Sequence, residues 1–235
     1  QSKWHEDLMR RGKSVFKKIV IIGLGLMGGS LAAACRKRFP RARVIGITRN
    51  RKALAFAVKK KWAHQGTDDI LKGARDADLV VLCTPVNAYL PLLKKIDRVV
   101  KPCALVMDVG SVKAEVHREL DRRNWKRICF VGAHPMVGSH ERGIEAGCPE
   151  LYENGTVILT RTKRTCPESY KAAKKFWTKV AAKVVTLKPE QHDKLIAGIS
   201  HLPHAIAVCL VQVPAREALP FAATGFRDTT RIAAS

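Results

Sequence analysis

Residues 18–30, KIVIIGLGLMGGS, decide the fold of this 235-residue chain. Residues 19–22 are branched and apolar, which is typical of a strand buried on both faces. Gly23, Gly25 and Gly28 follow in G-x-G-x-x-G spacing, and a helical run begins directly after them. In such a turn the first glycine permits a sharp bend, the second lets a pyrophosphate approach the backbone, and the third lets the helix pack close to the strand. The stretch therefore predicts a dinucleotide site, and a strand-to-helix turn without a ligand is the alternative.

Apolar strands alternate with helical stretches along the chain after this turn. We expect helices at 51–61, 86–100 and 167–181 and one that ends at 120, and further strands at 43–48, 79–83, 104–108, 128–131, 156–160 and 183–187. This alternation predicts an α/β fold with a doubly wound, mostly parallel sheet of the Rossmann type.

The strand pattern stops after Pro189, and the C-terminal part has a different character. Residues 190–213 form one long apolar helical pattern that Pro203 interrupts. We therefore expect two domains, a dinucleotide-binding domain over residues 1–188 and a smaller all-helical domain over residues 189–235.

The composition excludes several classes of protein. Seven scattered cysteines without a C-x-x-C pair predict reduced thiols in a cytoplasmic protein, with neither a disulfide framework nor a metal site. No apolar run approaches the ~20 residues that a membrane span needs. The 43 basic and 20 acidic residues give a net charge of +23, which suits nucleic acids or small anions. The basic residues are spread along the chain with few aromatic residues among them, so we expect no nucleic-acid partner.

The end of the second predicted strand indicates which nicotinamide cofactor the turn would bind. In NAD sites an acid lies about 20 residues beyond the glycine turn and holds the ribose hydroxyls. Here the sequence is Thr48-Arg49-Asn50-Arg51. Guanidinium groups suit a 2′-phosphate, so we expect NADP rather than NAD, unless these arginines only belong to the basic surface. Further contacts with the cofactor are expected from Leu26, Met27, Cys83, Thr84, Pro85 and Ser111.

Three further stretches carry candidate functional groups. His134 lies within 132–139, GAHPMVGS, directly after a predicted strand, where it would point into the ligand cleft. Residues 200–204, SHLPH, bring Ser200, His201 and His204 near one face of the long helix. The third stretch, 225–231, contains Arg231. For each of these residues the alternative is a purely structural role, as a side chain packed in the core or exposed to solvent.

Together these motifs resemble the prephenate/arogenate dehydrogenase family of tyrosine biosynthesis. The resemblance rests on GLGLMGGS, on DVGSVK at 108–113, on HPMVGSHERGIEAG at 134–147, on SHLPH and on GFRDTTRIAAS at 225–235. It implies oxidative decarboxylation of a small anionic cyclohexadienol, with hydride transfer to the nicotinamide and loss of the 4-hydroxyl proton as the ring becomes aromatic. Family members form dimers through their helical domain, so a homodimer is also implied.

The resemblance also implies roles for individual residues. His134 would accept the hydroxyl proton, which suits an imidazole at neutral pH. Ser111 would hydrogen-bond either His134 or the substrate hydroxyl, and Arg231 would pair with a substrate carboxylate. Ser139, Ser200, His201 and His204 are expected to line the substrate pocket.

Several alternatives stay open at this stage. The substrate is prephenate or arogenate, and the extra amino group of arogenate would require an acid, for which Glu141 in the loop after His134 is a candidate. A β-hydroxyacid-type dehydrogenase with Lys194 as its acid/base is a second enzyme class, and a basic nucleotide-binding or nucleic-acid-binding module without catalysis is a third. Family chains continue past the last motif, so we expect the helical domain to extend beyond Ser235.

Overall fold

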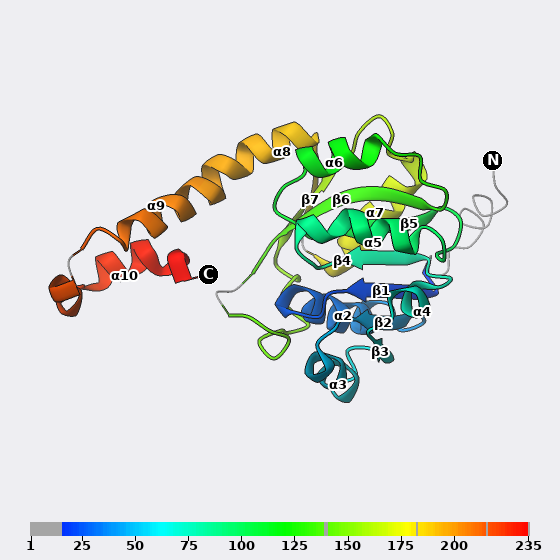
Figure 1. The fold of residues 1–235 in the computed structure, drawn as a ribbon, viewed down its shortest axis with the longest axis horizontal. Helices are drawn as coiled ribbons and strands as arrows, with labels where there is room; N and C mark the ends of the chain where they lie inside the picture. Colours follow the sequence, from blue (N-terminus) through cyan, green and yellow to red (C-terminus); the bar gives the residue numbers. More distant parts are fainter. Residues whose placement is uncertain (1–15, 139–140, 182, 215, 235) are drawn as a thin grey trace.

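The computed structural model describes residues 16–138, 141–181, 183–214 and 216–234. An eight-stranded sheet lies between two layers of helices, and the C-terminal helices form an arm that projects away from it (Figure 1). The predicted substrate residue Ser139 lies outside the described residues.

The sheet has the strand order β3-β2-β1-β4-β5-β6-β7-β8. All pairs from β3 to β6 are parallel, whereas β7 runs antiparallel to β6 and parallel to β8. This arrangement confirms the predicted doubly wound, mostly parallel sheet. The strands are β1 (Lys18–Ile22), β2 (Arg43–Ile47), β3 (Gln65–Thr67), β4 (Leu79–Leu82), β5 (Ala104–Asp108), β6 (Ile128–Met136), β7 (Thr156–Thr160) and β8 (Lys183–Leu187).

Apolar side chains from both faces of the sheet form two cores. On one face the sheet packs against α2, α3 and α7, with Leu31, Ala57 and Trp177 fully buried. On the other face it packs against α4, α5 and α6, with Leu93 and Leu120 buried. The helices are α2 (Leu26–Arg38), α3 (Arg51–Lys59), α4 (Ile70–Ala74), α5 (Tyr89–Ile96), α6 (Ala114–Asp121) and α7 (Pro167–Val180).

The order of the strands reverses between β1 and β4, because the chain leaves β1 toward β2 and later returns to pair β4 with the other side of β1. Ligands of open α/β sheets bind at the carboxyl ends of the strands beside such a switch point. The glycine turn after β1 and the residues after β4 therefore flank the expected ligand cleft.

Two details of the sheet differ from the prediction. The short β3 and α4 were not expected, because β3 has the sequence QGT and lacks an apolar pattern. The strand expected at 128–131 continues as β6 to Met136, since β7 pairs with it and places His134 opposite Ile158. The prediction that His134 follows the strand end was therefore wrong, because it lies within the strand.

The C-terminal region is helical, as predicted. It begins with α8 (Pro189–Ile196), a π-helical turn η2 (Ala197–His201) and α9 (Leu202–Leu210), which form one continuous rod. The irregularity is the π turn, in which the amide of Leu202 donates to the carbonyl of Ala197. It directly precedes Pro203, whose nitrogen has no proton to donate within the rod. The chain ends with η3 (Arg216–Phe221), α10 (Thr224–Thr230) and η4 (Arg231–Ala234).

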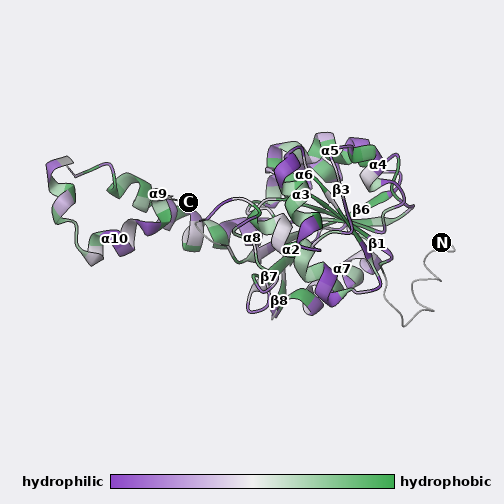
Figure 2. Cartoon of the chain, turned by 90° about the horizontal axis from the view of Figure 1, so that it is seen from below, coloured by the Kyte–Doolittle hydropathy of each residue, from purple (hydrophilic) through white to green (hydrophobic). Residues whose placement is uncertain are grey.

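The last helices pack on the rod. Both α10 and η4 contact α9, and the resulting arm extends away from the sheet in two perpendicular views (Figures 1 and 2). Among the described residues no helix has both the length and the apolar character that crossing a membrane requires.

Candidate active site

The glycine turn between β1 and α2 packs tightly against the end of β4. Gly23 has a φ of +96°, and a Cβ there would lie 2.5 Å from the carbonyl oxygen of Cys83. A Cβ on Gly28 would lie 1.7 Å from the carbonyl oxygen of Gly23. Only glycine fits at either position, so the first and third glycines have the structural roles that their spacing predicted.

Gly25 faces open space instead. No atom lies within 4 Å of the position its Cβ would take, and Gly25 is the N-cap of α2 without a side chain to cap it. The first turn of a helix has amide groups without intrahelical acceptors. Because Gly25 lines a cleft of about 720 Å³, these amides are available to an anionic group that enters the cleft.

Eight of the predicted cofactor residues line this cleft: Gly23, Gly25, Thr48, Arg49, Asn50, Cys83, Thr84 and Pro85. The predicted Leu26, Met27, Gly28, Arg51 and Ser111 are not among the lining residues. Gly28 is enclosed by the turn, Arg51 begins α3, and the carbonyl of Met27 accepts a hydrogen bond from the Tyr152 hydroxyl at 2.8 Å.

The side chains at the end of β2 are partly engaged within the protein. Asn50 Oδ1 accepts a hydrogen bond from the amide of Ala53 at 3.2 Å, which caps α3. Arg49 is exposed at the cleft. Two acids also line the cleft, although none follows β2. They are Asp68, directly after the unexpected β3, and Glu145.

The cleft contains a polar atom that suits a bound dinucleotide. The Oγ1 atom of Thr84 is buried and has no hydrogen-bond partner within the part of the chain that the structure describes. A buried hydroxyl without a partner is unusual in a native protein. Together with the uncapped start of α2 at Gly25, it fits a ligand that brings both anionic and hydrogen-bonding groups.

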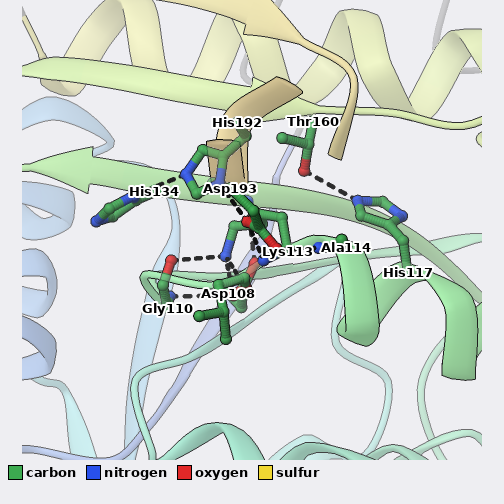
Figure 3. A network of polar contacts seen from close by, with 11 residues as sticks. Asp108, Gly110, Lys113, Ala114, His117, His134, Thr160, His192 and Asp193 are labelled. Atoms are coloured by element: carbon green, nitrogen blue, oxygen red, sulfur yellow. Dashed lines mark hydrogen bonds and ion pairs between the residues drawn. The ribbon is translucent and has the colours of Figure 1, made fainter. Parts of the chain in front are cut away.

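A buried ion pair lies at the carboxyl end of β5 (Figure 3). Lys113 Nζ is 2.6 Å from Asp108 Oδ2, and both side chains are fully buried. The ammonium group also donates to the carbonyl of Gly110 at 2.6 Å, while Asp108 Oδ1 accepts from the amide of Ala133 at 3.0 Å. Asp108 therefore ties β5 to the segment of β6 that contains His134.

A second part of the network joins β6 to the C-terminal rod. His134 Nδ1 lies 2.8 Å from His192 Nε2, and His192 Nδ1 lies 2.7 Å from Asp193 Oδ1. The Asp193 carboxylate accepts from the amides of Lys113 and Ala114, both at 2.8 Å, at the start of α6. These contacts hold α8 against the end of the sheet and bring His192 to His134 (Figure 3).

The surroundings of His134 keep its imidazole neutral. Burial is the largest cause that lowers the pKa of His134, to about 3, and the nearby Lys113, His192 and His201 act in the same direction, against Asp193. Burial also lowers the pKa of His192. Both imidazoles are therefore uncharged at neutral pH, so each has one ring nitrogen with a free lone pair.

The hydrogen bonds to Asp193 lower the pKa of its carboxyl group and so favour the charged form. Burial alone would raise the pKa of Asp193, but the hydrogen bonds from His192 and from the amides of Ala114 and Lys113 outweigh it and hold the pKa below its ordinary value. Asp193 is therefore a carboxylate at neutral pH.

The remaining predicted residues are only partly brought together. His201 is close enough to His134 to influence its pKa, whereas Ser200 is exposed and His204 is half-buried. Ser111 is exposed, and the described hydrogen bonds do not include the predicted one between Ser111 and His134. Its expected place beside His134 is taken by His192.

Arg231 lies on the C-terminal arm. It begins η4, is exposed, and belongs to the arm that packs on α9. The structure does not bring it into the network around His134.

Sequence reasoning missed four residues of the site: Asp108, Lys113, His192 and Asp193. Asp108 and Lys113 are the first and last residues of the DVGSVK stretch, whose Ser111 was singled out instead. The adjacent His192 and Asp193 near the start of the long helix were a possible signal, but nothing local indicates that they meet a strand 58 residues away.

Comparisons with known proteins agree with this architecture. The profile described as "Prephenate dehydrogenase, nucleotide-binding domain" matches residues 31–186, and "Prephenate dehydrogenase, dimerization domain" matches residues 188–235. The prephenate dehydrogenase of Bacillus subtilis is 38% identical over 224 residues, which cover 92% of this chain and 60% of that protein. This chain therefore spans less than two thirds of the length of that relative.

For two further relatives the match covers a larger share of the relative's own length. The cyclohexadienyl dehydrogenase of Zymomonas mobilis is 33% identical over 229 residues, which cover 94% of this chain and 78% of that protein. The crystal structure of Aquifex aeolicus prephenate dehydrogenase in complex with hydroxyphenyl propionate and NAD+ has a TM-score of 0.87 at 34% identity, and the match covers 96% of this chain and 80% of that chain.

Proposed function

This chain belongs to the prephenate dehydrogenase family, and from that premise we propose that the protein oxidatively decarboxylates prephenate or arogenate with a nicotinamide cofactor. The observation that carries the proposal is the buried, neutral imidazole of His134 beside the carboxyl ends of β5 and β6. A neutral imidazole has a free lone pair with which it can take a proton from a substrate hydroxyl.

His134 acts on the 4-hydroxyl of the substrate. Its Nε2 accepts the hydroxyl proton while the C4–H bond breaks, and the electrons of that bond leave as a hydride. The ring carboxylate then departs as CO2, and the electrons of the broken C–C bond complete the aromatic ring and pass to the C4 oxygen. The resulting phenolate takes the proton back from His134. When bound, the oxidised nicotinamide supplies the hydride acceptor. Residues lining the cleft would hold it, through the amides beside Gly25 and the hydroxyl of Thr84.

We propose NADP rather than NAD as the preferred cofactor. Arg49 is exposed at the end of β2 and lines the cleft, where a guanidinium group can engage a 2′-phosphate. Asp68 lines the same cleft and is the group that would instead favour a ribose hydroxyl. The positive charge of the chain, +23, supports binding of the more anionic cofactor.

The anionic substrate is proposed to bind between the end of β6 and the C-terminal rod. His201 and His204 lie on the rod within one turn of each other, and the proximity of His201 to His134 supports a role in this pocket. Ser111, Ser139, Ser200 and Arg231 remain proposed substrate contacts, with Arg231 supplied by an arm that would fold onto the site or by a second copy of the chain.

We also propose a homodimer that forms through the C-terminal region, with the domain boundary near residue 188. Large apolar side chains on this region are exposed in the single chain: Ile199 at 69%, Leu202 at 56%, Val213 at 77% and Phe221 at 87%. Exposed apolar patches of this kind mark protein–protein contacts. Sedimentation of the native protein and of Leu202→Glu tests this, since a dimer is expected for the first and a monomer for the second.

A β-hydroxyacid-type dehydrogenase is the competing enzyme class, and Lys194 was its candidate acid/base. Lys194 is exposed on α8, on the side opposite to the buried His192. This placement favours the histidine-based reaction.

One assay distinguishes these functions. The protein is incubated with prephenate and with arogenate, each with NAD+ and with NADP+, and both reduced nicotinamide and CO2 are measured. Equal amounts of the two products are expected from at least one substrate. Absence of CO2 from all four mixtures, under conditions where the protein is folded, would refute the proposal.

A further inference from the structure

His192 donates a hydrogen bond to Asp193, and the chemistry of the carboxylate fixes this direction. Two amides, those of Lys113 and Ala114, already donate to Asp193, and these hydrogen bonds hold its pKa low. An ionised carboxylate can only accept hydrogen bonds. The hydrogen between Asp193 Oδ1 and His192 Nδ1, which are 2.7 Å apart, therefore belongs to His192.

The direction of this hydrogen bond determines the protonation state of the second ring nitrogen of His192, Nε2. The side chain of His192 is fully buried and neutral, so it carries one ring hydrogen, and that hydrogen is on Nδ1. Its Nε2 consequently has a free lone pair. His134 Nδ1 lies 2.8 Å from this lone pair and must donate to it.

We propose that His192 is a positioning residue which, backed by Asp193, holds His134 as the tautomer with hydrogen on Nδ1 and a free lone pair on Nε2. This inference rests on the proposed function, because it concerns the base of that reaction. The lone pair on Nε2 is the one that can take the substrate proton. With hydrogen on Nε2 instead, His134 would present a donor to the hydroxyl and could not act as the base.

The same chain supports His134 after it has accepted the proton. The imidazolium then has Asp193 as its nearest carboxylate along the chain of hydrogen bonds, separated from it by one neutral imidazole. Lys113, whose buried ammonium group is bound to Asp108, disfavours the same charge. His192 thus connects His134 on the sheet to the negative charge of Asp193 on the C-terminal rod. The rod must therefore contact the sheet for His134 to have the required tautomer.

A purely structural role is the alternative, because Asp193 also joins α8 to the start of α6. The tautomer of His134 separates the two roles. We would label the histidines with 15N and record two-bond 1H–15N correlation spectra, which distinguish protonated from unprotonated ring nitrogens. His134→Asn identifies the signals of His134.

Two variants and one control form the test. His192→Phe removes the acceptor at Nε2, whereas His192→Gln keeps a carbonyl oxygen that can accept from His134 and an amide that can donate to Asp193. The control is His117→Phe: His117 is a second buried histidine, whose Nε2 lies 2.9 Å from Thr160 Oγ1, and it is not part of this chain of hydrogen bonds.

The native protein, His192→Gln and His117→Phe are expected to have hydrogen on Nδ1 of His134, whereas in His192→Phe it moves to Nε2. We expect kcat to fall about 10²- to 10⁴-fold in His192→Phe with little change in KM, because His134 with hydrogen on Nε2 cannot act as the base. His192→Gln is expected to restore most of kcat.

Two results would overturn the inference. One is hydrogen on Nε2 of His134 in the native protein, which can be measured even if His192→Phe does not fold. The other is an unchanged tautomer in folded His192→Phe. A native protein with the expected tautomer that converts neither prephenate nor arogenate would refute the proposed function and still support the inference.

Discussion

The stability of the protein should depend on pH through His134. Burial is the largest cause of its low pKa of about 3, with contributions in the same direction from Lys113, His192 and His201 and an opposing one from Asp193. An unfolded histidine has a pKa near ~6.5. Because the folded value is lower, the unfolded chain takes up a proton first as the pH falls, so the free energy of unfolding decreases below about pH 6.5.

The size of this effect follows from the two pKa values. Each pH unit between them changes the free energy of unfolding by about 1.4 kcal/mol. Between pH 7 and pH 5, His134 should therefore remove about 2 kcal/mol of stability, and the loss should continue until the pH approaches about 3.

Urea unfolding followed by tryptophan fluorescence measures this, since Trp177 is fully buried in the core. The native protein is compared with His134→Asn and His134→Gln at several pH values, at constant ionic strength and a fixed protein concentration. A change in packing shifts the stability equally at every pH, whereas the titration changes the slope. Parallel pH curves for the native protein and both variants would show that His134 does not have the low pKa assigned to it.

Three further substitutions test the cofactor cleft. Gly28→Ala would place a methyl group 1.7 Å from the carbonyl oxygen of Gly23, so we expect a clear loss of thermal stability and of nucleotide binding, and a stable variant that binds cofactor would contradict the close packing of the turn. Thr84→Val should leave thermal stability unchanged, because the buried hydroxyl has no partner among the described residues, but should weaken cofactor affinity by about 5- to 10-fold, the value of one hydrogen bond. Arg49→Ala should raise KM for NADP+ about 10-fold and leave KM for NAD+ nearly unchanged, and equal effects on both would refute the phosphate contact.

The features that could be predicted from the sequence are those with a local cause. The roles of Gly23 and Gly28 follow from their neighbours in the turn, and the buried strands are marked by continuous apolar runs such as LVVL in β4. The short β3 has no such run and was missed. The extension of β6 depends on pairing with β7, which begins 20 residues after β6 ends, so no local pattern marks it.

The candidate site was predictable only in part for the same reason. His134 was found because its motif is distinctive, but its partner His192 lies 58 residues away in the sequence. The burial of Lys113 is equally hard to predict, since lysine is rarely buried and the compensating Asp108 reaches it only once β5 has paired on both sides. The network forms only where the ends of β5 and β6 meet the C-terminal rod.

The role of His134 as the base that takes the hydroxyl proton is tested most directly by kcat of His134→Asn. Asparagine is smaller than histidine, is polar and cannot take up a proton at neutral pH. If His134 is the base, kcat with the better of the two substrates falls about 10²- to 10⁴-fold while KM changes little. A folded His134→Asn protein that retains nearly the native kcat would contradict it.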